Sequence, residues 1–391
     1  MNWTTPAQLH GQVQRLWDKG AILAEQAGAA SCFPYRLTLK SPTASEIGAD
    51  FAAVRAWAQA LQASSGLRLE YRSFRHRLFG DNCLPSAAWV ETPAEACRLL
   101  GKTREAGVFA ALVASTVTQQ PSLRSWLQKY PLRALDHAAD WPQLLALIGW
   151  LQARPRPGCY LRQIDLPGID SKFVETRRGL LAELLDLALP PEAIDTSASG
   201  NAGFNRRYGF RDKPERIRCR FLDPTCAPLP ALAGADLTLD SASFAALAPA
   251  VERVFICENE VNFLAFPPVD RGFLIFGAGY GLAALAQAGW LQSLPVYYWG
   301  DLDTHGFAIL DELRQHLPQA RSLLMDETTL LEHRARWGHE ASPTQRPLSH
   351  LNADELATYT ALIDHTHGPS IRLEQERLPF SLLQDTLSQL P

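Results

Sequence analysis

The sequence predicts three parts: a mostly helical N-terminal arm over residues 1–130, a small winged-helix-like domain over 131–238 and an α/β domain over 239–391. Three observations lead to this prediction. Apolar residues recur at helical spacing through much of the first part, and a strongly basic stretch follows a strong helix in the second. The third part alternates continuous apolar runs with helical segments. A length of 391 residues suits two or three domains.

The N-terminal arm begins with a helix start signal. Thr5 followed by Pro6 is typical of a helix N-cap with proline at the first helical position, and apolar residues then recur at helical spacing through Trp17. The elements expected next are a strand at 35–40, a helix at 51–61, a strand at 67–75 and helices from about 93 to 151 with breaks at Pro121, Pro131 and Pro142.

The middle domain is expected to continue near Tyr160, where a short strand (YLRQI) leads into a strong helix at 171–188. A basic stretch follows at 206–220 and holds seven Lys or Arg residues. Arginines neutralise the phosphates of nucleic acids, so this stretch is a candidate DNA contact, with a solvated edge strand as the alternative. The candidate contact residues are Arg206, Arg207, Arg211, Lys213, Arg216 and Arg218. A segment rich in Pro and Ala at 224–235 predicts a linker.

Four apolar strands separated by helices are expected in the C-terminal domain. The strands are VERVFIC, GFLIFG, PVYYW and ARSLLM, and the helices are expected at 282–288, from about 306 to 316, and after the fourth strand. Continuous apolar strands of this kind are typical of a parallel sheet that helices cover on both faces. The expected fold class of this part is therefore a four-stranded parallel sheet flanked by helices.

Charge is distributed unevenly along the chain. Residues 1–239 hold 28 Lys and Arg against 22 Asp and Glu, whereas residues 240–391 hold 9 against 19 and contain no lysine. This imbalance suits one part that meets an anion and another that holds cations. The apolar runs are shorter than the roughly 20 residues that span a bilayer, and the N-terminus has no apolar signal core. With seven scattered cysteines and no CxxC, a cytoplasmic protein with reduced thiols and no membrane partner is expected.

Three acidic residues follow predicted strands, at the edge where parallel sheets bind their ligands. Glu258 follows VERVFIC, and Asp301 and Asp303 follow PVYYWG. Residues two apart in an extended segment point the same way, so both aspartates can aim at one point. Close carboxylates repel one another unless a cation lies among them, and hard oxygen ligands select Mg²⁺, with Mn²⁺ as the alternative. The three residues are candidate catalytic and metal-binding groups.

Other interpretations of the acidic residues stay open. Asp301 and Asp303 also suit a turn and a helix cap. Glu260 is a further candidate metal ligand, although a solvated helix start suits it as well. Glu374 and Glu376 either reach the site or belong to an ordinary surface segment.

Two patterns from other classes of enzyme compete with a metal site. The segment FGAGYGLAAL imitates a dinucleotide fingerprint, but Leu282 stands at the third glycine position. The segment GDLDTHG resembles the DxD of haloacid-dehalogenase-type phosphatases, which usually need a later lysine, and no lysine follows Lys213.

An acidic residue after one strand and a DxD after another resemble a Toprim domain, which occurs in primases, topoisomerases and related nucleases. The closer similarity is to the A subunit of topoisomerase VI, whose Glu-x-Glu and GDxDxxG correspond to CENE and GDLDTHG in this chain.

Over its whole length the chain resembles the JetD family, the nuclease subunits of Wadjet anti-plasmid defence systems. The segments that carry the resemblance are, in order, YLRQIDLPGIDSKFVETRRGLL, IRCRFLD, CENEVNFLAFP, YYWGDLDTHGFAIL and RLEQERLPF. The resemblance implies an N-terminal arm, a winged-helix-like CAP domain and a C-terminal Toprim domain. It also implies homodimers, a condensin-like SMC complex as partner and closed circular plasmid DNA as substrate.

One departure from the topoisomerase VI pattern concerns the mechanism. Those enzymes attack DNA with a CAP-domain tyrosine in a characteristic motif, and Tyr160 and Tyr208 lie in the corresponding region without its neighbours. The expected function is therefore a Mg²⁺-dependent endonuclease for double-stranded DNA, with Glu258, Asp301 and Asp303 as ligands and Glu258 as candidate general base. The alternatives are a covalent DNA transesterase and a non-catalytic DNA-binding scaffold with a degenerate Toprim domain.

Overall fold

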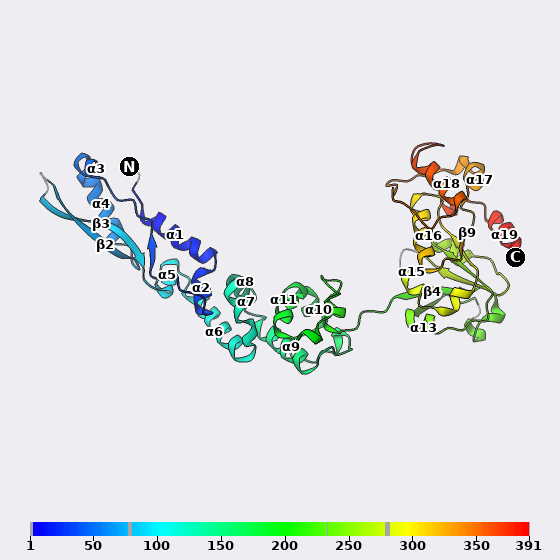
Figure 1. Cartoon of the computed structure of the whole chain (residues 1–391), viewed down its shortest axis with the longest axis horizontal. Helices are drawn as coiled ribbons and strands as arrows, with labels where there is room; N and C mark the ends of the chain where they lie inside the picture. The colour runs from blue at the N-terminus through cyan, green and yellow to red at the C-terminus, as the bar shows by residue number, and fades with distance from the viewer. Residues whose placement is uncertain (1–2, 77–79, 233, 278–281, 391) are drawn as a thin grey trace. The chain divides into compact units, whose positions relative to one another are not determined.

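The chain folds into two compact units that divide between Asp212 and Lys213. The computed structural model describes residues 3–76, 80–232, 234–277 and 282–390 (Figure 1). A hydrophobic core that includes residues from Trp3 to Phe210 holds the first unit together. Two further cores stabilise the second unit.

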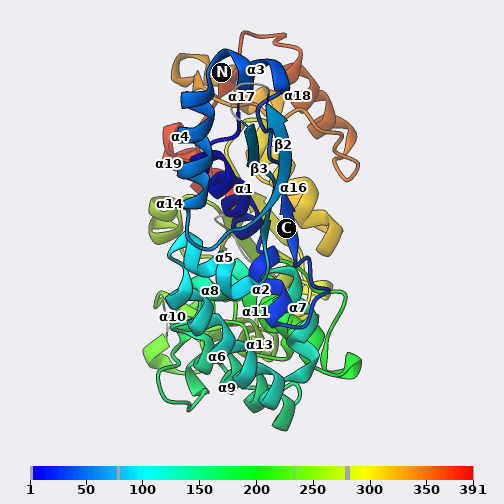
Figure 2. The same ribbon diagram turned by 90° about the vertical axis from the view of Figure 1, so that its left-hand side faces the viewer.

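The first unit consists of helices and one small antiparallel sheet. Its helices are α1 (Pro6–Asp18), α2 (Ala21–Gln26), α3 (Ala44–Ala49), α4 (Phe51–Gln62), α5 (Pro93–Leu100), α6 (Thr103–Gln119), α7 (Arg124–Lys129), α8 (Pro131–Asp136), α9 (Trp141–Ala153), α10 (Ser171–Thr176), α11 (Arg178–Ala188) and α12 (Phe204–Tyr208). Its strands are β1 (Tyr35–Leu37), β2 (Arg68–His76) and β3 (Gly80–Val90), in the order β1-β3-β2. Figure 2 shows α4 alongside the hairpin of β2 and β3. The prediction of a mostly helical N-terminal region is confirmed.

Local sequence explains the helix boundaries of this unit. The Thr5 side chain accepts the N–H of Gln8 (3.2 Å), and the Gln8 side chain accepts the N–H of Thr5 (2.9 Å). This reciprocal capping satisfies two N–H groups that a helix start leaves without partners. Prolines stand in the first turn of α8 and α9, where a missing N–H costs nothing. The expected helix at 171–188 is interrupted at Arg177.

Two predicted strands differ in the structure. Residues 161–163 of the YLRQI segment form a 3₁₀ turn, because the Gln163 side chain accepts the Tyr160 N–H (2.8 Å) and closes the chain locally. The basic strand β4 (Arg216–Phe221) pairs with β5 (Leu237–Asp240) and β7 (Gly272–Phe276), so it belongs to the sheet of the second unit and not to a middle module.

Alternation along β4 explains its place in that sheet. Ile217, Cys219 and Phe221 are buried in a core of the second unit, and the arginines between them lie on the other face of the strand. The period of two predicts a strand with one apolar face, but it does not identify the partner against which that face packs.

The second unit contains a six-stranded sheet in the order β5-β4-β7-β6-β8-β9. Its other strands are β6 (Arg253–Cys257), β7 (Gly272–Phe276), β8 (Val296–Trp299) and β9 (Ala320–Ser322), with a separate pair β10 (Gly338–His339) and β11 (Ile371–Arg372). Its helices are α13 (Ser241–Ala245), α14 (Glu260–Ala265), α15 (Leu282–Leu285), α16 (Thr304–His316), α17 (Glu327–Glu332), α18 (Ala353–Ile363) and α19 (Phe380–Ser388). The four predicted strands β7, β6, β8 and β9 are parallel neighbours, and β4 and β5 extend the sheet as antiparallel strands.

Helices cover both faces of this sheet. Residues of α13, α15, α16, α17 and α18 contribute to one core, and residues of α14 and α19 contribute to the other. The last residues of β6 and β8, Cys257 and Trp299, are partners in the parallel register. Glu258 and Gly300 therefore begin loops at the same edge of the sheet, where parallel α/β sheets bind ligands.

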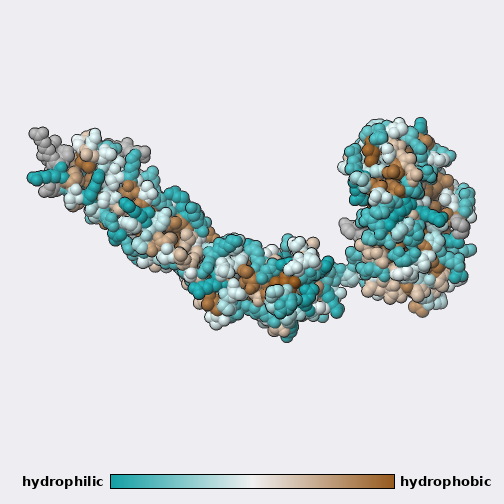
Figure 3. All heavy atoms as spheres, viewed as in Figure 1, coloured by the Kyte–Doolittle hydropathy of each residue, from teal (hydrophilic) through white to brown (hydrophobic). Residues whose placement is uncertain are grey.

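Apolar side chains on the surface are scattered among hydrophilic ones on the face drawn in Figure 3. The exposed large apolar residues include Val261 and Leu264 of α14. Among the helices in the described ranges, none combines the length and the apolar character that crossing a membrane requires.

Candidate functional site

The loop between β8 and α16 presents two aspartates in a tight turn. Asp303 is the N-cap of α16, since its Oδ1 accepts the N–H of Gly306 (2.8 Å). A Cβ at position 306 would lie 2.1 Å from the Asp301 carbonyl oxygen, so this approach requires glycine. At the start of the loop, the N–H of Gly300 donates to the Sδ of Met325 (3.3 Å). These contacts fix the direction in which the aspartates point.

In each aspartate, one carboxylate oxygen accepts a hydrogen bond from a backbone N–H, and the other oxygen faces the side chain of Arg372. Oδ1 of Asp301 accepts the N–H of Gln375 (2.9 Å), as Oδ1 of Asp303 accepts that of Gly306. Nη2 of Arg372 donates to Oδ2 of Asp301 (2.6 Å), and Nε of Arg372 lies 3.2 Å from Oδ2 of Asp303. The two aspartates therefore converge on one cation, the guanidinium of Arg372.

Glu258 lies beside this pair at the end of β6. Its carboxylate accepts a hydrogen bond from the buried hydroxyl of Tyr298 on β8. Burial raises the pKa of Glu258 to about 7; the Tyr298 hydrogen bond opposes this shift, and the charges of Asp301 and Asp303 add to it. A carboxyl group with a pKa near 7 can exchange protons at neutral pH.

Glu340 adds a fourth carboxylate, which the sequence analysis did not single out. It follows β10, is 4% exposed, and accepts hydrogen bonds from the N–H (3.2 Å) and hydroxyl (2.6 Å) of Thr304. Burial raises the pKa of Asp303; the N–H of Gly306 lowers it, and the charge of Glu340 raises it further. Neither Glu340 nor Arg372 follows a strand of the parallel sheet, so the strand-end pattern did not point to them.

The other predicted acidic residues lie around this cluster. Glu260 is exposed and forms an ion pair with Arg218. Glu374 lies 3.7 Å from Nε of Arg372, at the rim of the cluster. Glu376 accepts a hydrogen bond from the side-chain amide of the asparagine that follows Glu258 (2.6 Å).

The donor chemistry of the cluster suits a hard divalent cation. One oxygen from each of Asp301 and Asp303 already faces a single positive group, and Glu258 lies beside them. Within the part of the chain that the structure describes, no three His, Cys, Asp or Glu side chains converge closely enough to hold a metal ion. The positive group that lies between the two aspartates is the guanidinium of Arg372.

The predicted DNA-contact residues divide into two groups. Three of them form ion pairs with acidic residues of their own unit: Arg206 with Asp195, Arg207 with Asp186, and Arg218 with Asp236 and Glu260. Arg211, Lys213 and Arg216 are exposed, and no described residue forms an ion pair with their side chains. The second group is therefore available to an anionic ligand.

The two tyrosines considered as nucleophiles differ in exposure. Tyr208 is buried, and its hydroxyl donates to Asp186 (2.7 Å). Burial and this carboxylate raise the pKa of Tyr208 above its usual range. Tyr160 is 39% exposed. In this fold Tyr160 is accessible to solvent and Tyr208 is not.

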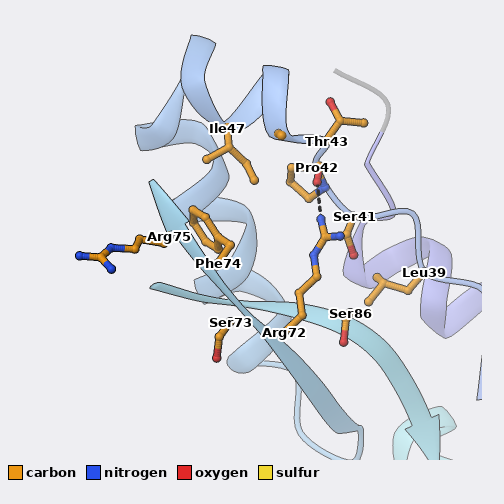
Figure 4. A pocket seen from close by; sticks show the side chains of 11 residues that line it. Leu39, Ser41, Pro42, Thr43, Ile47, Arg72, Ser73, Phe74, Arg75 and Ser86 are labelled. Atoms are coloured by element: carbon orange, nitrogen blue, oxygen red, sulfur yellow. Dashed lines mark hydrogen bonds between the residues drawn. The ribbon is translucent and has the colours of Figure 1, made fainter. Parts of the chain in front are cut away.

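A separate pocket of about 680 Å³ lies in the first unit between α3 and the β2–β3 hairpin (Figure 4). Ile47 and Phe74 line it, together with Arg72, whose guanidinium donates to the carbonyl of Pro42 (3.0 Å). The lining residues that the structure describes include Ser and Thr hydroxyls but no Asp, Glu, His or Cys. The described lining of this pocket therefore lacks the acidic, histidine and cysteine side chains that usually bind metal ions in proteins.

The second unit defines a class of protein: a mixed α/β domain with an acidic site at the carboxyl ends of neighbouring parallel strands. Two family models match the chain. Residues 6–186 match the N-terminal part of an uncharacterized protein conserved in bacteria, and residues 209–387 match the C-terminal part of the Wadjet protein JetD. The C-terminal part of the chain, residues 209–387, therefore belongs to the JetD family. No curated protein matches the chain.

Proposed function

We propose that this protein is the nuclease subunit of a Wadjet system, with the second unit as a Toprim-type catalytic domain. Its proposed substrate is double-stranded, closed circular plasmid DNA, and its proposed cofactor is Mg²⁺, with Mn²⁺ as a substitute. The observation that carries the proposal is the convergence of Asp301 and Asp303 on one cation beside Glu258, at neighbouring strand ends. Membership of the JetD family supports a role in plasmid defence.

Asp301, Asp303 and Glu258 are the residues that would hold the metal ion, which when bound would stabilise negative charge on the phosphodiester oxygens. Backbone N–H groups of Gln375 and Gly306 orient the aspartates in advance, which reduces reorganisation during the reaction. Glu258, which lies beside the two aspartates at the end of β6, is the proposed acceptor of the proton of an attacking water molecule.

Exposed cations would position the DNA. Arg211, Lys213 and Arg216 are the proposed backbone contacts, and such contacts fix a duplex without reading its sequence. Other Wadjet subunits are the proposed partners, among them a condensin-like SMC complex, and the proposed active form is a cytoplasmic homodimer.

The test of the proposal is metal-dependent cleavage. Protein with its partner subunits is incubated with closed circular plasmid in Mg²⁺, in Mn²⁺ or in excess EDTA, and the products are separated on agarose. We expect linear product only with a divalent cation, and its loss in Asp301→Asn. Glu312→Gln, which alters an exposed carboxylate of α16, is the matched control and should cut normally. Cleavage in EDTA would refute the proposal.

The alternative is a covalent mechanism in which a tyrosine attacks the DNA, and the exposure of Tyr160 is compatible with it. A denaturing gel of the cleaved DNA, with and without protease, separates the two mechanisms. We expect free DNA ends without protease treatment and normal cleavage by Tyr160→Phe. If the DNA is released only after protease treatment, the protein is covalently attached to it, and the mechanism is transesterification instead of hydrolysis. A scaffold with a degenerate site would usually have lost one of the three carboxylates, and this chain retains all three.

A further inference from the structure

Arg372 contacts both aspartates of the site, although it comes from a segment outside the six-stranded sheet. It is the last residue of β11, which pairs with β10. Its neighbour Leu373 exchanges backbone hydrogen bonds of 2.9 and 3.1 Å with Leu302, the residue between the two aspartates. The backbone on both sides of Arg372 is therefore held in place. Its side chain is 38% exposed, so the guanidinium has a route to solvent.

The guanidinium is incompletely satisfied in this position. Its Nη2 donates to Asp301, but its buried Nε has no well-aligned hydrogen bond, although it lies 3.2 Å from Oδ2 of Asp303. The same two Oδ2 atoms are the carboxylate oxygens that backbone N–H groups leave available. Arg372 thus contacts the two carboxylate oxygens that a divalent cation would need, while its Nε–H group makes no hydrogen bond.

A purely structural ion pair in the same segment provides a comparison. Arg377 donates to Glu374 (2.9 Å) and to the carbonyl of Arg336 (3.1 Å). None of its described contacts is with Asp301 or Asp303. Arg372 differs because its ion pairs involve both residues proposed to bind the metal.

We propose that Arg372 is an internal counter-ion that competes with the divalent cation for Asp301 and Asp303, and that metal binding displaces its guanidinium from the cluster. This inference rests on the proposed function, because it requires the aspartates to be metal ligands. Two cations at the same two oxygens repel each other strongly at such short range. The apparent metal affinity is therefore reduced by the fraction of molecules in which Arg372 still occupies the site.

The first test is direct metal binding to the full-length protein, measured by the electron paramagnetic resonance signal of free Mn²⁺. Arg372→Gln removes the charge and keeps a polar side chain, so it should bind Mn²⁺ roughly tenfold more tightly than the wild type. Arg372→Lys keeps the charge and should bind close to wild type. Arg377→Gln, the matched control, should leave the affinity unchanged.

Failure of this inference and failure of the proposed function give different results. In the first case, the wild-type protein binds Mn²⁺, Asp301→Asn does not, and Arg372→Gln binds Mn²⁺ as tightly as the wild type or more weakly. That result would refute competition by Arg372 and would leave the proposed metal site intact. If wild-type protein and Asp301→Asn bind Mn²⁺ equally, or neither binds it, the aspartates are not metal ligands and both proposals fall.

A second measurement does not depend on the folding of a variant. The wild-type protein is treated with phenylglyoxal, which modifies accessible guanidinium groups, in EDTA and in saturating Mg²⁺, and modified peptides are quantified by mass spectrometry. We expect the modification of Arg372 to increase several-fold in Mg²⁺ while that of Arg377 stays constant. Equal modification of Arg372 in both conditions would contradict its displacement.

Discussion

Glu258 is tied to the fold by a hydrogen bond that does not depend on its charge. The Tyr298 hydroxyl donates to its carboxylate and also lies 3.3 Å from the carbonyl of Gly306 as a second acceptor. An amide at position 258 would accept the same hydrogen bond. The chemistry of Glu258 can therefore be removed without breaking the fold around it.

Glu258→Gln should reduce plasmid cleavage at least 10²–10⁴-fold, the usual cost of losing a general base, because Gln neither accepts a proton nor neutralises a metal ion. The melting temperature should stay within a few degrees of wild type. Glu260→Gln is the control two residues further on, where the carboxylate pairs with Arg218. Normal cleavage by Glu258→Gln, or equal loss in Glu260→Gln, would show that the wrong glutamate has been assigned.

The exposed basic residues allow a sharper test of DNA binding than the whole basic stretch. Replacing Arg211, Lys213 and Arg216 with Ala should weaken binding to all duplex sequences alike. The slope of log K against log salt should fall by about 0.9 for each phosphate that the variant no longer neutralises, which a fluorescence titration at several salt concentrations measures.

The paired basic residues provide the matched control for this variant. Replacing Arg206 should change DNA affinity less, because that side chain pairs with Asp195. An unchanged salt slope in the triple variant would show that the exposed basic residues do not contact DNA phosphates and are only hydrated surface groups.

At the scale of elements, the pattern of apolar residues predicts which segments form buried strands, but it does not predict the segments against which those strands pack. Strands β6, β7 and β8 were predictable because each is a mostly continuous apolar run bounded by turns, whereas β9 consists only of the first three residues, Ala-Arg-Ser, of the predicted run ARSLLM. Strand β3 was not predictable, since GDNCLPSAAWV neither alternates nor stays apolar. The same holds for the site. The ends of the parallel strands indicate Glu258, Asp301 and Asp303, whereas Arg372 ends β11 and Glu340 follows β10, the two short strands outside the main sheet. Tertiary contacts alone bring those two residues to the site.

A buried ion pair joins three elements of the second unit. Nη2 of Arg314 on α16 donates to Oε1 of Glu355 on α18 (2.8 Å), and the hydroxyl of Ser322 on β9 donates to the same oxygen (2.6 Å). Glu355→Gln would leave the Arg314 charge buried without its partner and should lower the free energy of unfolding by about 3–5 kcal/mol. Denaturant unfolding measures this loss.

The same pair predicts a pH dependence. Burial alone would raise the pKa of Glu355, but hydrogen bonds from Arg314 and Ser322 outweigh burial and hold the pKa below its ordinary value. Such a group stabilises the fold above its unfolded pKa of about 4.3 and loses this effect as the pH falls through its folded pKa. The difference in melting temperature between wild type and Glu355→Gln should thus be large near pH 7 and shrink below about pH 4. A constant difference from pH 7 to 3 would contradict this account.

At the scale of the whole molecule, the two units have separate cores, and residues 211–216 at their division are all exposed. Brief trypsin digestion should therefore cut first after Arg211 and yield two stable fragments. Arg98, an exposed residue within α5, should be cut later because a helix must open before cleavage. Mass spectrometry of a time course identifies the first site.

Duplex DNA should slow this first cut if Arg211 contacts its backbone. Early cleavage inside β4 or the core helices would contradict the division at Asp212.

Asp303 serves as the cap of α16 as well as a member of the acidic cluster. Its loss therefore carries two separable penalties. Alanine removes the cap, which typically costs about 0.5–2 kcal/mol, whereas Asn, Ser or Thr at the same position would still accept a helix N–H. If the proposed function holds, a relative with Asn, Ser or Thr at position 303 should lack catalytic activity but keep the helix cap and fold normally. A relative with a residue that cannot cap the helix should lose both activity and stability.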